Sequence, residues 1–181
     1  MSKVFTSAVV IIPPEAKWVP IQKIRIKFDR QFNRWMPHII LLYPFRSENE
    51  YPKLEKDFSN KCKTIETFKI HLKNFNYFNH GKQRYTLWLK PEPIELITNL
   101  QLKILKIVPD CNDVNKYKHG FRPHLSVGQI QGRKNIIDIM TTLQNTWNKI
   151  HFPLNEIFFI SRERSKTSKF EIKKRIKLKK E

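Results

Sequence analysis

Hydrophobic and polar residues follow two periods along the chain, and these periods predict strands and helices in a regular order. Alternation with a period of two and short runs of β-branched or other apolar residues are typical of strands, and they predict strands at residues 3–12, 38–43, 68–72, 84–90, 124–130, 156–162 and 169–178. Apolar residues spaced three or four apart are typical of amphipathic helices, and they predict helices at residues 15–28, 48–64, 94–108 and 134–150. Turn-forming and polar residues predict a connection at 74–81 and a loop at 109–120, and Pro153 should end the last helical unit.

The order of these elements repeats along the chain. Each half contains a strand, a helix, a strand, a helix and a strand, and one extra strand ends the second half. Few residues are identical between the halves, so the repeat lies in the order of the secondary-structure elements and not in the sequence itself. It predicts a single bilobal α/β (α+β) domain over residues 1–181, with one lobe at about 1–80 and a pseudo-symmetric lobe at about 81–181. Each lobe would hold a small antiparallel or mixed sheet with helices outside.

Two of the predicted strands open with proline, histidine and then aliphatic residues. The first is PHIILLYPF, which begins at Pro37-His38, and the second is PHLSVGQI, which begins at Pro123-His124. A residue before proline avoids the α region, so each pattern enters its strand in an extended conformation. A single histidine on a strand is usually an ordinary core or surface residue. Two copies of the pattern in a matching repeat favour a functional interpretation.

The residues that follow the second histidine add detail to this pattern. Side chains alternate between the two faces of a strand, so Ser126 shares a face with His124. The corresponding position after His38 is held by Ile40. Gly128 removes a side chain at a point where another element can approach the strand closely.

On these residues the chain resembles the 2H phosphoesterase superfamily, also called 2′-5′ RNA ligase-like proteins. That family carries two His-x-Thr/Ser motifs on two strands of a pseudo-symmetric fold. His124-Leu125-Ser126 matches the motif completely, whereas His38-Ile39-Ile40 keeps the histidine and places Ile40 where the family has a hydroxyl residue. The resemblance implies a bilobal fold with both histidine strands facing a central cleft. It also implies a metal-independent phosphodiesterase that acts on RNA ends, 2′,3′-cyclic phosphates or 2′-5′ linkages.

Two imidazoles that face each other across a cleft can share the work of general acid and general base near neutral pH. Ser126 would donate a hydrogen bond to a phosphate oxygen, which Ile40 cannot do. Loss of one such donor costs on the order of 10²-fold in rate. The alternative is therefore a non-catalytic RNA- or nucleotide-binding protein that descends from a 2H enzyme. No third ligand with metal-site spacing accompanies the histidines, so we expect neither a metal nor a cofactor.

The charge of the chain points to a polyanionic partner. The formal net charge is +19, which favours RNA or a nucleotide 2′,3′-cyclic phosphate as the ligand, although a lysine-biased composition would give the same number. Residues 162–181 hold ten lysines or arginines against three glutamates, and their strand has either a phosphate-binding edge or an edge protected from aggregation. A basic structural component of a ribonucleoprotein is a third class. The expected substrate contacts, beside Ser126, are Arg122, Tyr43, His119, Arg162, Lys173 and Arg175.

The remaining features bound the setting of the protein. The longest apolar runs are too short to span a bilayer, and the first residues do not form a signal peptide. Cys62 and Cys111 lack metal-site spacing, so we expect free thiols in a reducing compartment. These observations predict an intracellular monomer with no membrane association, in the cytoplasm or, as the alternative, in the nucleus.

Overall fold

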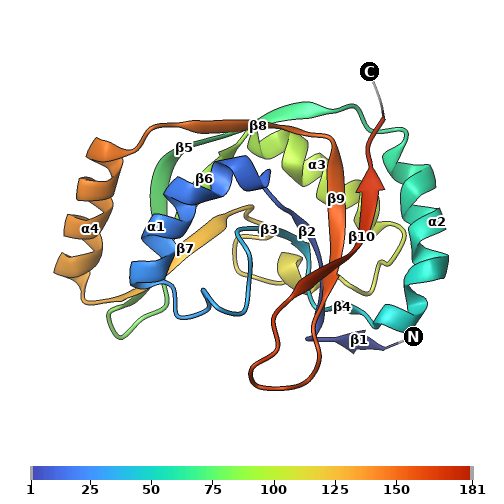
Figure 1. Ribbon diagram of the computed structural model, residues 1–181, viewed down its shortest axis with the longest axis horizontal. Coiled ribbons are helices and arrows are strands. Elements are labelled where there is room, and N and C mark those ends of the chain that lie inside the picture. The colour runs from blue at the N-terminus through green and yellow to red at the C-terminus, as the bar shows by residue number, and fades with distance from the viewer. Residues whose placement is uncertain (1, 180–181) are drawn as a thin grey trace.

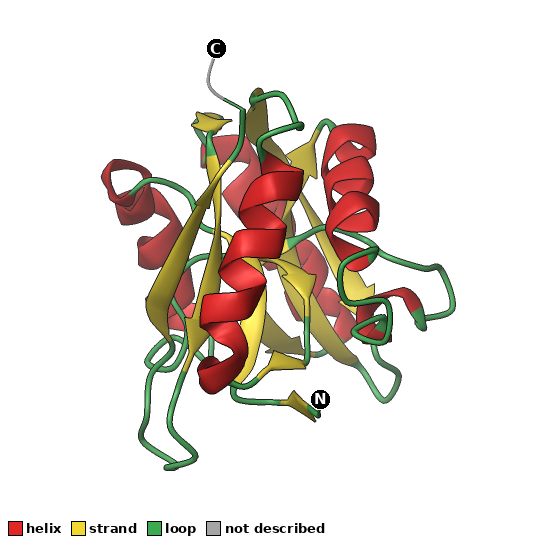
Figure 2. Cartoon of the chain, turned by 90° about the vertical axis from the view of Figure 1, so that its right-hand side faces the viewer, coloured by secondary structure: helices red, strands yellow, loops and turns green. Residues whose placement is uncertain are grey.

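The computed structural model describes residues 2–179 and consists of antiparallel sheets with helices packed around them (Figures 1 and 2). The strands are β1 (Lys3–Val4), β2 (Ser7–Ile11), β3 (Ile39–Leu42), β4 (Phe45–Arg46), β5 (Phe68–Asn79), β6 (Arg84–Glu92), β7 (Leu125–Gln131), β8 (Ile150–Leu154), β9 (Glu156–Ser161) and β10 (Glu171–Lys177). The α-helices are α1 (Trp18–Phe28), α2 (Tyr51–Cys62), α3 (Ile94–Leu105) and α4 (Arg133–Thr146), and short 3₁₀ turns lie at Glu15–Lys17, Glu48–Glu50 and Asp113–Asn115.

Two four-stranded sheets give the protein its two lobes. The first sheet has the strand order β10-β9-β2-β3 and the second has the order β7-β6-β5-β8, and every pairing within them is antiparallel. Each histidine strand, β3 or β7, is therefore an edge strand of its own sheet, and the two edges contact each other. This arrangement confirms the predicted α+β class with two lobes.

The chain crosses between the sheets more often than the sequence suggested. The first sheet takes β2 and β3 from the N-terminal part and β9 and β10 from the C-terminal end, while β5 joins β6 in the second sheet. The expected division near residue 80 falls inside the hairpin of β5 and β6, so the sheets do not follow the ranges 1–80 and 81–181. Only Asn155 separates β8 from β9, and this nearly continuous run pairs with β5 before Asn155 and with β2 after it.

Two local predictions were wrong for identifiable reasons. The segment expected to be a connection at 74–81 is mostly strand, because β5 continues to Asn79 and pairs with β6 along that length. The turn itself is confined to Gly81, Lys82 and Gln83, which all have positive φ. Pro153 lies within β8 opposite Lys69. A proline fits there because β8 is an edge strand, on which alternate backbone N–H groups face away from the sheet and need no partner strand.

Helix α1 links the two lobes by packing directly on β7. A Cβ placed on Gly128 would lie 2.5 Å from the Cβ of Phe28, at the end of α1. The prediction that Gly128 permits a close approach is thus confirmed. Helix α2 contacts β10 of the first sheet and stands in front of it in Figure 2, and α4 contacts β5, β6 and β7 of the second sheet.

Across the described part of the chain, no helix is both long enough and apolar enough to cross a membrane. The cysteines Cys62 and Cys111 are buried free thiols, and burial raises the pKa of Cys62 to about 12 and that of Cys111 to about 11. Both are therefore protonated and inert at neutral pH.

Candidate active site

The two histidines stand at corresponding positions, each one residue before the edge strand that it introduces. His38 precedes β3 and His124 precedes β7, and both side chains are half-buried. A positive charge on His124 lowers the pKa of His38, so the two rings lie close enough to interact electrostatically. The fold thus brings together two residues that are 86 positions apart in the chain.

Both imidazole rings are held by the same backbone interaction. The Nδ1 atom of His38 lies 2.7 Å from the carbonyl oxygen of Met36, and the Nδ1 atom of His124 lies 2.7 Å from the carbonyl oxygen of Arg122. Because a carbonyl oxygen only accepts, Nδ1 carries the proton and donates it in each pair. The lone pair of a neutral ring is therefore on Nε2, the atom that is left to act on a substrate.

An aromatic stack supports the ring of His38. Trp35 stacks on His38 with a centroid distance of 4.5 Å and an interplanar angle of 17°. Phe170, just before β10, also stacks on Trp35 at 3.7 Å, and the guanidinium of Arg162 lies over Phe170. The C-terminal hairpin therefore helps to fix the orientation of the first histidine.

A second aromatic group surrounds His124. Phe78 of β5 meets His124 edge-on at 4.9 Å, and Phe78 also stacks on Trp88 of β6. Trp88 is the cross-strand neighbour of Ser126, and its buried indole N–H has no partner within residues 2–179. Each histidine thus has its own aromatic support, which comes from its own sheet or from the loop before it.

Desolvation dominates the electrostatics of the pair. Burial lowers the pKa of His38 to about 4, with the Met36 carbonyl opposing the shift and the charge of Arg25 adding to it. Burial also lowers the pKa of His124, and the charge of Arg122 adds to that shift. Both rings are therefore neutral at pH 7 in the free protein, and an anionic ligand would favour their protonation.

A buried polar network connects α1 to both histidine strands. Arg25, which is 1% exposed, donates from Nε to Asp29 at 2.8 Å and from Nη2 to the carbonyl oxygen of Trp35 at 2.9 Å. Asp29 accepts a hydrogen bond from Gln129 of β7 at 3.2 Å. The backbone N–H of Arg30 donates to the same glutamine at 2.9 Å. The network fixes the loop that carries Trp35 and places it against β7.

The two positions that follow the histidines differ in environment. Ser126 is half-buried beside Trp88 and remains open to a ligand. Ile40 instead packs into an apolar cluster on the first sheet with Trp35 and Tyr43. The missing hydroxyl is therefore replaced by a packing contact.

The structure brings some of the other predicted residues to the histidines. Arg122 supplies the carbonyl that orients His124, and its guanidinium lies 5.3 Å from the centroid of the Phe78 ring. Tyr43 meets Trp35 edge-on at 5.7 Å. Arg162 donates to the carbonyl oxygens of Glu163 and Ser165 and so shapes the loop before β10.

Three predicted contacts lie apart from this cluster. His119 is exposed on the loop before Pro123. Lys173 pairs with Glu171 at 3.1 Å, and Arg175 pairs with Glu156 at 3.0 Å, so carboxylates already compensate both charges. Residues 180 and 181, at the end of the basic tail, lie outside the described residues.

The sequence interpretation missed Trp35, Phe78, Trp88 and the network of Arg25, Asp29 and Gln129. Trp35 lies only three residues before His38, which was the one available signal. Phe78 was assigned to a connection, because the length of β5 was underestimated. The ion pair joins residues four apart on α1, and such spacing is common on solvated helix faces.

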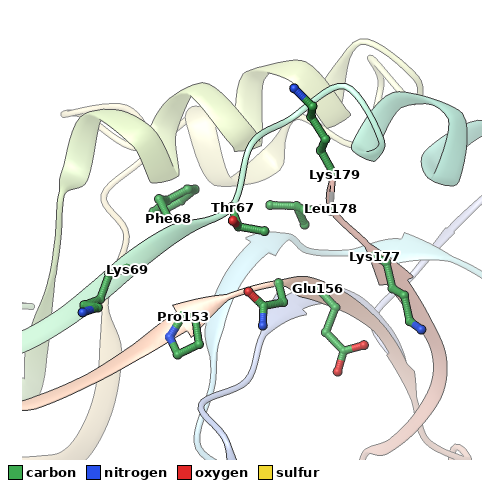
Figure 3. A pocket seen from close by; sticks show the side chains of 9 residues that line it. Thr67, Phe68, Lys69, Pro153, Glu156, Lys177, Leu178 and Lys179 are labelled. Carbon is green, nitrogen blue, oxygen red and sulfur yellow. The ribbon is translucent and has the colours of Figure 1, made fainter. Parts of the chain in front are cut away.

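A groove lies away from the histidine strands, and Figure 3 shows the residues that line it. It has a volume of about 580 Å³ and lies where β8 passes into β9, and no residue of β3 or β7 lines it. Figure 3 shows Lys179 on one side of the groove, and Glu156 and Lys177 on the other. None of the residues that line the groove belongs to the paired-histidine site.

Comparison with known proteins gives a consistent assignment. Residues 13–166 match the profile of the 2′-5′ RNA ligase superfamily, and no protein of curated function matches the sequence. TT0787 of Thermus thermophilus is similar in structure, with a TM-score of 0.61, 16% identity and coverage of 95% of this chain and 97% of that chain. LigT of Escherichia coli complexed with 3′-AMP gives a TM-score of 0.60 at 14% identity and covers 99% and 100% of the two chains. LigT complexed with ATP gives 0.61 at 13% identity, with 96% and 98% covered.

Proposed function

The chain belongs to the 2′-5′ RNA ligase superfamily, and from that premise we propose that it is a metal-independent phosphodiesterase. It would act on RNA ends that carry a 2′,3′-cyclic phosphate or on 2′-5′ linkages. The observation that carries the proposal is the pair of histidines whose Nδ1 atoms are held alike by backbone carbonyls at 2.7 Å. That geometry leaves two Nε2 atoms for general acid and general base chemistry.

In this reaction one histidine removes a proton from water and the other donates a proton to the leaving oxygen. The base must be neutral, and His38 has the pKa near 4 that keeps it so. We therefore assign His38 as the base and His124 as the acid. The bound phosphate raises the pKa of the acid, because a nearby negative charge favours the imidazolium form. The water oxygen bonds to phosphorus as the bond from phosphorus to the leaving ribose oxygen breaks, and that oxygen departs with the proton from His124. The proton that His38 takes from water passes to solvent.

Two further groups would stabilise the charge that develops on the phosphate. Ser126 shares the neighbourhood of His124 and would donate its hydroxyl hydrogen to a non-bridging oxygen. Arg122 is exposed beside the same ring and would add a positive charge. Donors aimed at such oxygens are each worth about 10²-fold or more in rate. All of these residues belong to one chain, so the reaction needs no partner subunit.

The similar structures support a nucleotide ligand. LigT of Escherichia coli has been observed in complexes with ATP and with 3′-AMP. The +19 charge of this chain is suited to the same chemistry, because lysines and arginines attract phosphates. Metal assistance is not required by the proposal, and residues 2–179 contain no group of three potential metal ligands.

A second candidate function is RNA or nucleotide binding without turnover. The specific observation in its favour is Ile40, which fills an apolar cluster where the family motif has a hydroxyl residue. A binding protein would retain the cleft and its arginines but would not depend on Nε2 of either histidine.

The deciding experiment is a turnover assay with a short RNA that ends in a 2′,3′-cyclic phosphate, in the presence of EDTA. We expect turnover by the wild type and a loss of about 10²–10⁴-fold in His38→Gln and in His124→Gln, which is the usual contribution of general acid–base catalysis. His151→Gln is the matched control, because it removes an exposed imidazole on β8 without touching either ring.

Three results would count against the phosphodiesterase. Turnover that requires a divalent metal would exclude the metal-independent reaction. Wild-type activity in both histidine variants would remove both residues from the mechanism. Tight RNA binding with no turnover, on cyclic, 2′-5′-linked and 3′-5′-linked substrates alike, would establish the binding protein instead.

A further inference from the structure

We propose that the RNA strand leading to the reacting phosphate lies on an aromatic ledge formed by Phe5, Tyr43 and Tyr117, flanked by Arg34 and Arg162. The ledge would make single-stranded RNA of several nucleotides a better ligand than a free cyclic nucleotide. This inference rests on the proposed function and specifies its substrate.

The first line of support is a series of ring contacts that leads outward from His38. The ring of Trp35 stacks on His38 at 4.5 Å, Tyr43 meets Trp35 edge-on at 5.7 Å, and Phe5 meets Tyr43 edge-on at 5.9 Å. The hydroxyl of Tyr43 donates to the carbonyl oxygen of Phe5 at 3.0 Å, which fixes this end of the series. The side chain of Phe5 is 67% exposed, so the series ends at the surface.

The second line of support is the loop that carries Tyr117. It is anchored to the N-terminal strands, because Lys3 of β1 pairs with Asp113 and Arg46 of β4 pairs with Asp110. Tyr117 is 74% exposed and lies four residues after Asp113, whose partner Lys3 lies two residues before Phe5. The anchored loop thus carries a second exposed ring on the side of the protein where Phe5 lies, and a charge on Tyr117 raises the pKa of Tyr43.

Charge decides which ligand suits these rings. Arg34 directly precedes Trp35, and the guanidinium of Arg162 lies over Phe170, which stacks on Trp35. Charges on both arginines lower the pKa of Tyr43, against the larger effect of burial. Within residues 2–179, the salt bridges of the C-terminal strand use Lys173, Lys174, Arg175 and Lys179. No salt bridge within residues 2–179 involves Arg34 or Arg162. Exposed rings beside arginines that form no salt bridge suit a ligand with flat bases and negative phosphates.

Single-stranded RNA combines both properties. Bases stack on aromatic side chains without sequence selectivity, and arginines beside the rings contact the backbone phosphates. An apolar protein segment would cover the rings but would leave both guanidinium groups without an anion. The proximity of the ledge to His38 then places the terminal phosphate at the histidine pair.

The test measures affinity rather than turnover. A labelled hexaribonucleotide with a 3′-phosphate, which resembles a product and does not react, is titrated with wild type, Phe5→Ala, Tyr117→Ala and the double variant. Loss of one stacking contact, at about 1–3 kcal/mol, predicts about tenfold weaker binding for each single variant and about 10²-fold for the double variant. Binding of 3′-AMP should change by less than about twofold.

Two controls separate stacking from general surface effects. Ile137→Ala removes an exposed apolar side chain on α4 and should leave RNA affinity unchanged. Tyr117→Phe keeps the ring and should keep most of the affinity. Phe5 and Tyr117 are both largely exposed, so their variants should unfold at the wild-type temperature, which a thermal melt verifies.

The outcomes distinguish this inference from the proposed reaction. RNA affinity that depends on Phe5 and Tyr117 in a protein without turnover would support the ledge and refute the phosphodiesterase. Turnover of cyclic nucleotides together with unchanged RNA affinity in the double variant would refute the ledge alone. If the double variant retained its RNA affinity but lost a self-association that the wild type shows in sedimentation, the surface would be a contact between two copies of the chain. That result would also refute the ledge.

Discussion

Gly128→Ala tests whether α1 sets the geometry of the active site. The added Cβ would lie 2.5 Å from the Cβ and 3.2 Å from the carbonyl oxygen of Phe28, whereas non-bonded carbons settle at about 3.5–4.0 Å. The end of α1 must therefore move by about 1 Å. Phe28 cannot avoid the contact by rotating its side chain, because its Cβ is attached directly to the helix backbone.

The expected result has two parts. Overpacking of this kind costs about 1–3 kcal/mol, so urea unfolding should show a reduction of that size in the free energy of unfolding. The end of α1 also carries Asp29, whose network holds Trp35 against His38. A displacement of about 1 Å at the reacting groups costs about 10²-fold, so turnover should fall by a similar factor.

Two comparisons make the reasoning refutable. Gln131→Ala, at the exposed end of the same strand, should change stability by less than about 0.5 kcal/mol. Combining Gly128→Ala with Phe28→Ala should not restore stability, because the clashing Cβ remains. A Gly128→Ala protein with wild-type stability and turnover, or a full rescue by Phe28→Ala, would show that α1 does not rest on β7 through its backbone.

Three other substitutions probe the buried charges and the altered motif. Asp29→Asn leaves the guanidinium of Arg25 buried without a carboxylate and should cost about 3–5 kcal/mol in urea unfolding, whereas the exposed Asp57→Asn should cost almost nothing. Ile40→Thr restores a hydroxyl after the first histidine and should raise kcat about tenfold or more; an unchanged kcat would mean that no phosphate oxygen reaches that position. Because the pKa of His38 falls from about 6.5 in the unfolded chain to about 4 in the folded protein, the unfolded chain binds more protons between these values. The free energy of unfolding should therefore decrease as the pH is lowered through that range, and His38→Gln should flatten the decrease.

The sequence was most informative where the constraint is local. The Pro-His patterns at 37–38 and 123–124 place an extended entry before a short apolar strand, and both strands formed at those positions. Gly128 indicated a close approach because the absence of a side chain has few other uses within a strand. The α+β class followed from the two periods of apolar residues.

The sequence was less informative where partners are distant. Nothing local to residues 150–154 shows that they pair with β5, because that pairing depends on the course of the whole second sheet. The stack of Trp35 on His38 is fixed by Phe170 from the other end of the chain. The compensation of Lys173 and Arg175 by glutamates likewise depends on tertiary contacts that periodicity does not contain.

The exchange of strands between the two lobes has a consequence for synthesis on the ribosome. The second sheet needs only residues 68–154, whereas the interior strand β2 of the first sheet waits for β9. β2 therefore remains unpaired on one side until residues 156–161 have been made, which is about 7–30 s later at the usual rates of elongation. We expect the second sheet to form first and the nascent chain to offer an unpaired β2 edge to chaperones. The His38 half of the active site is then completed only when β9 and Phe170 have joined it.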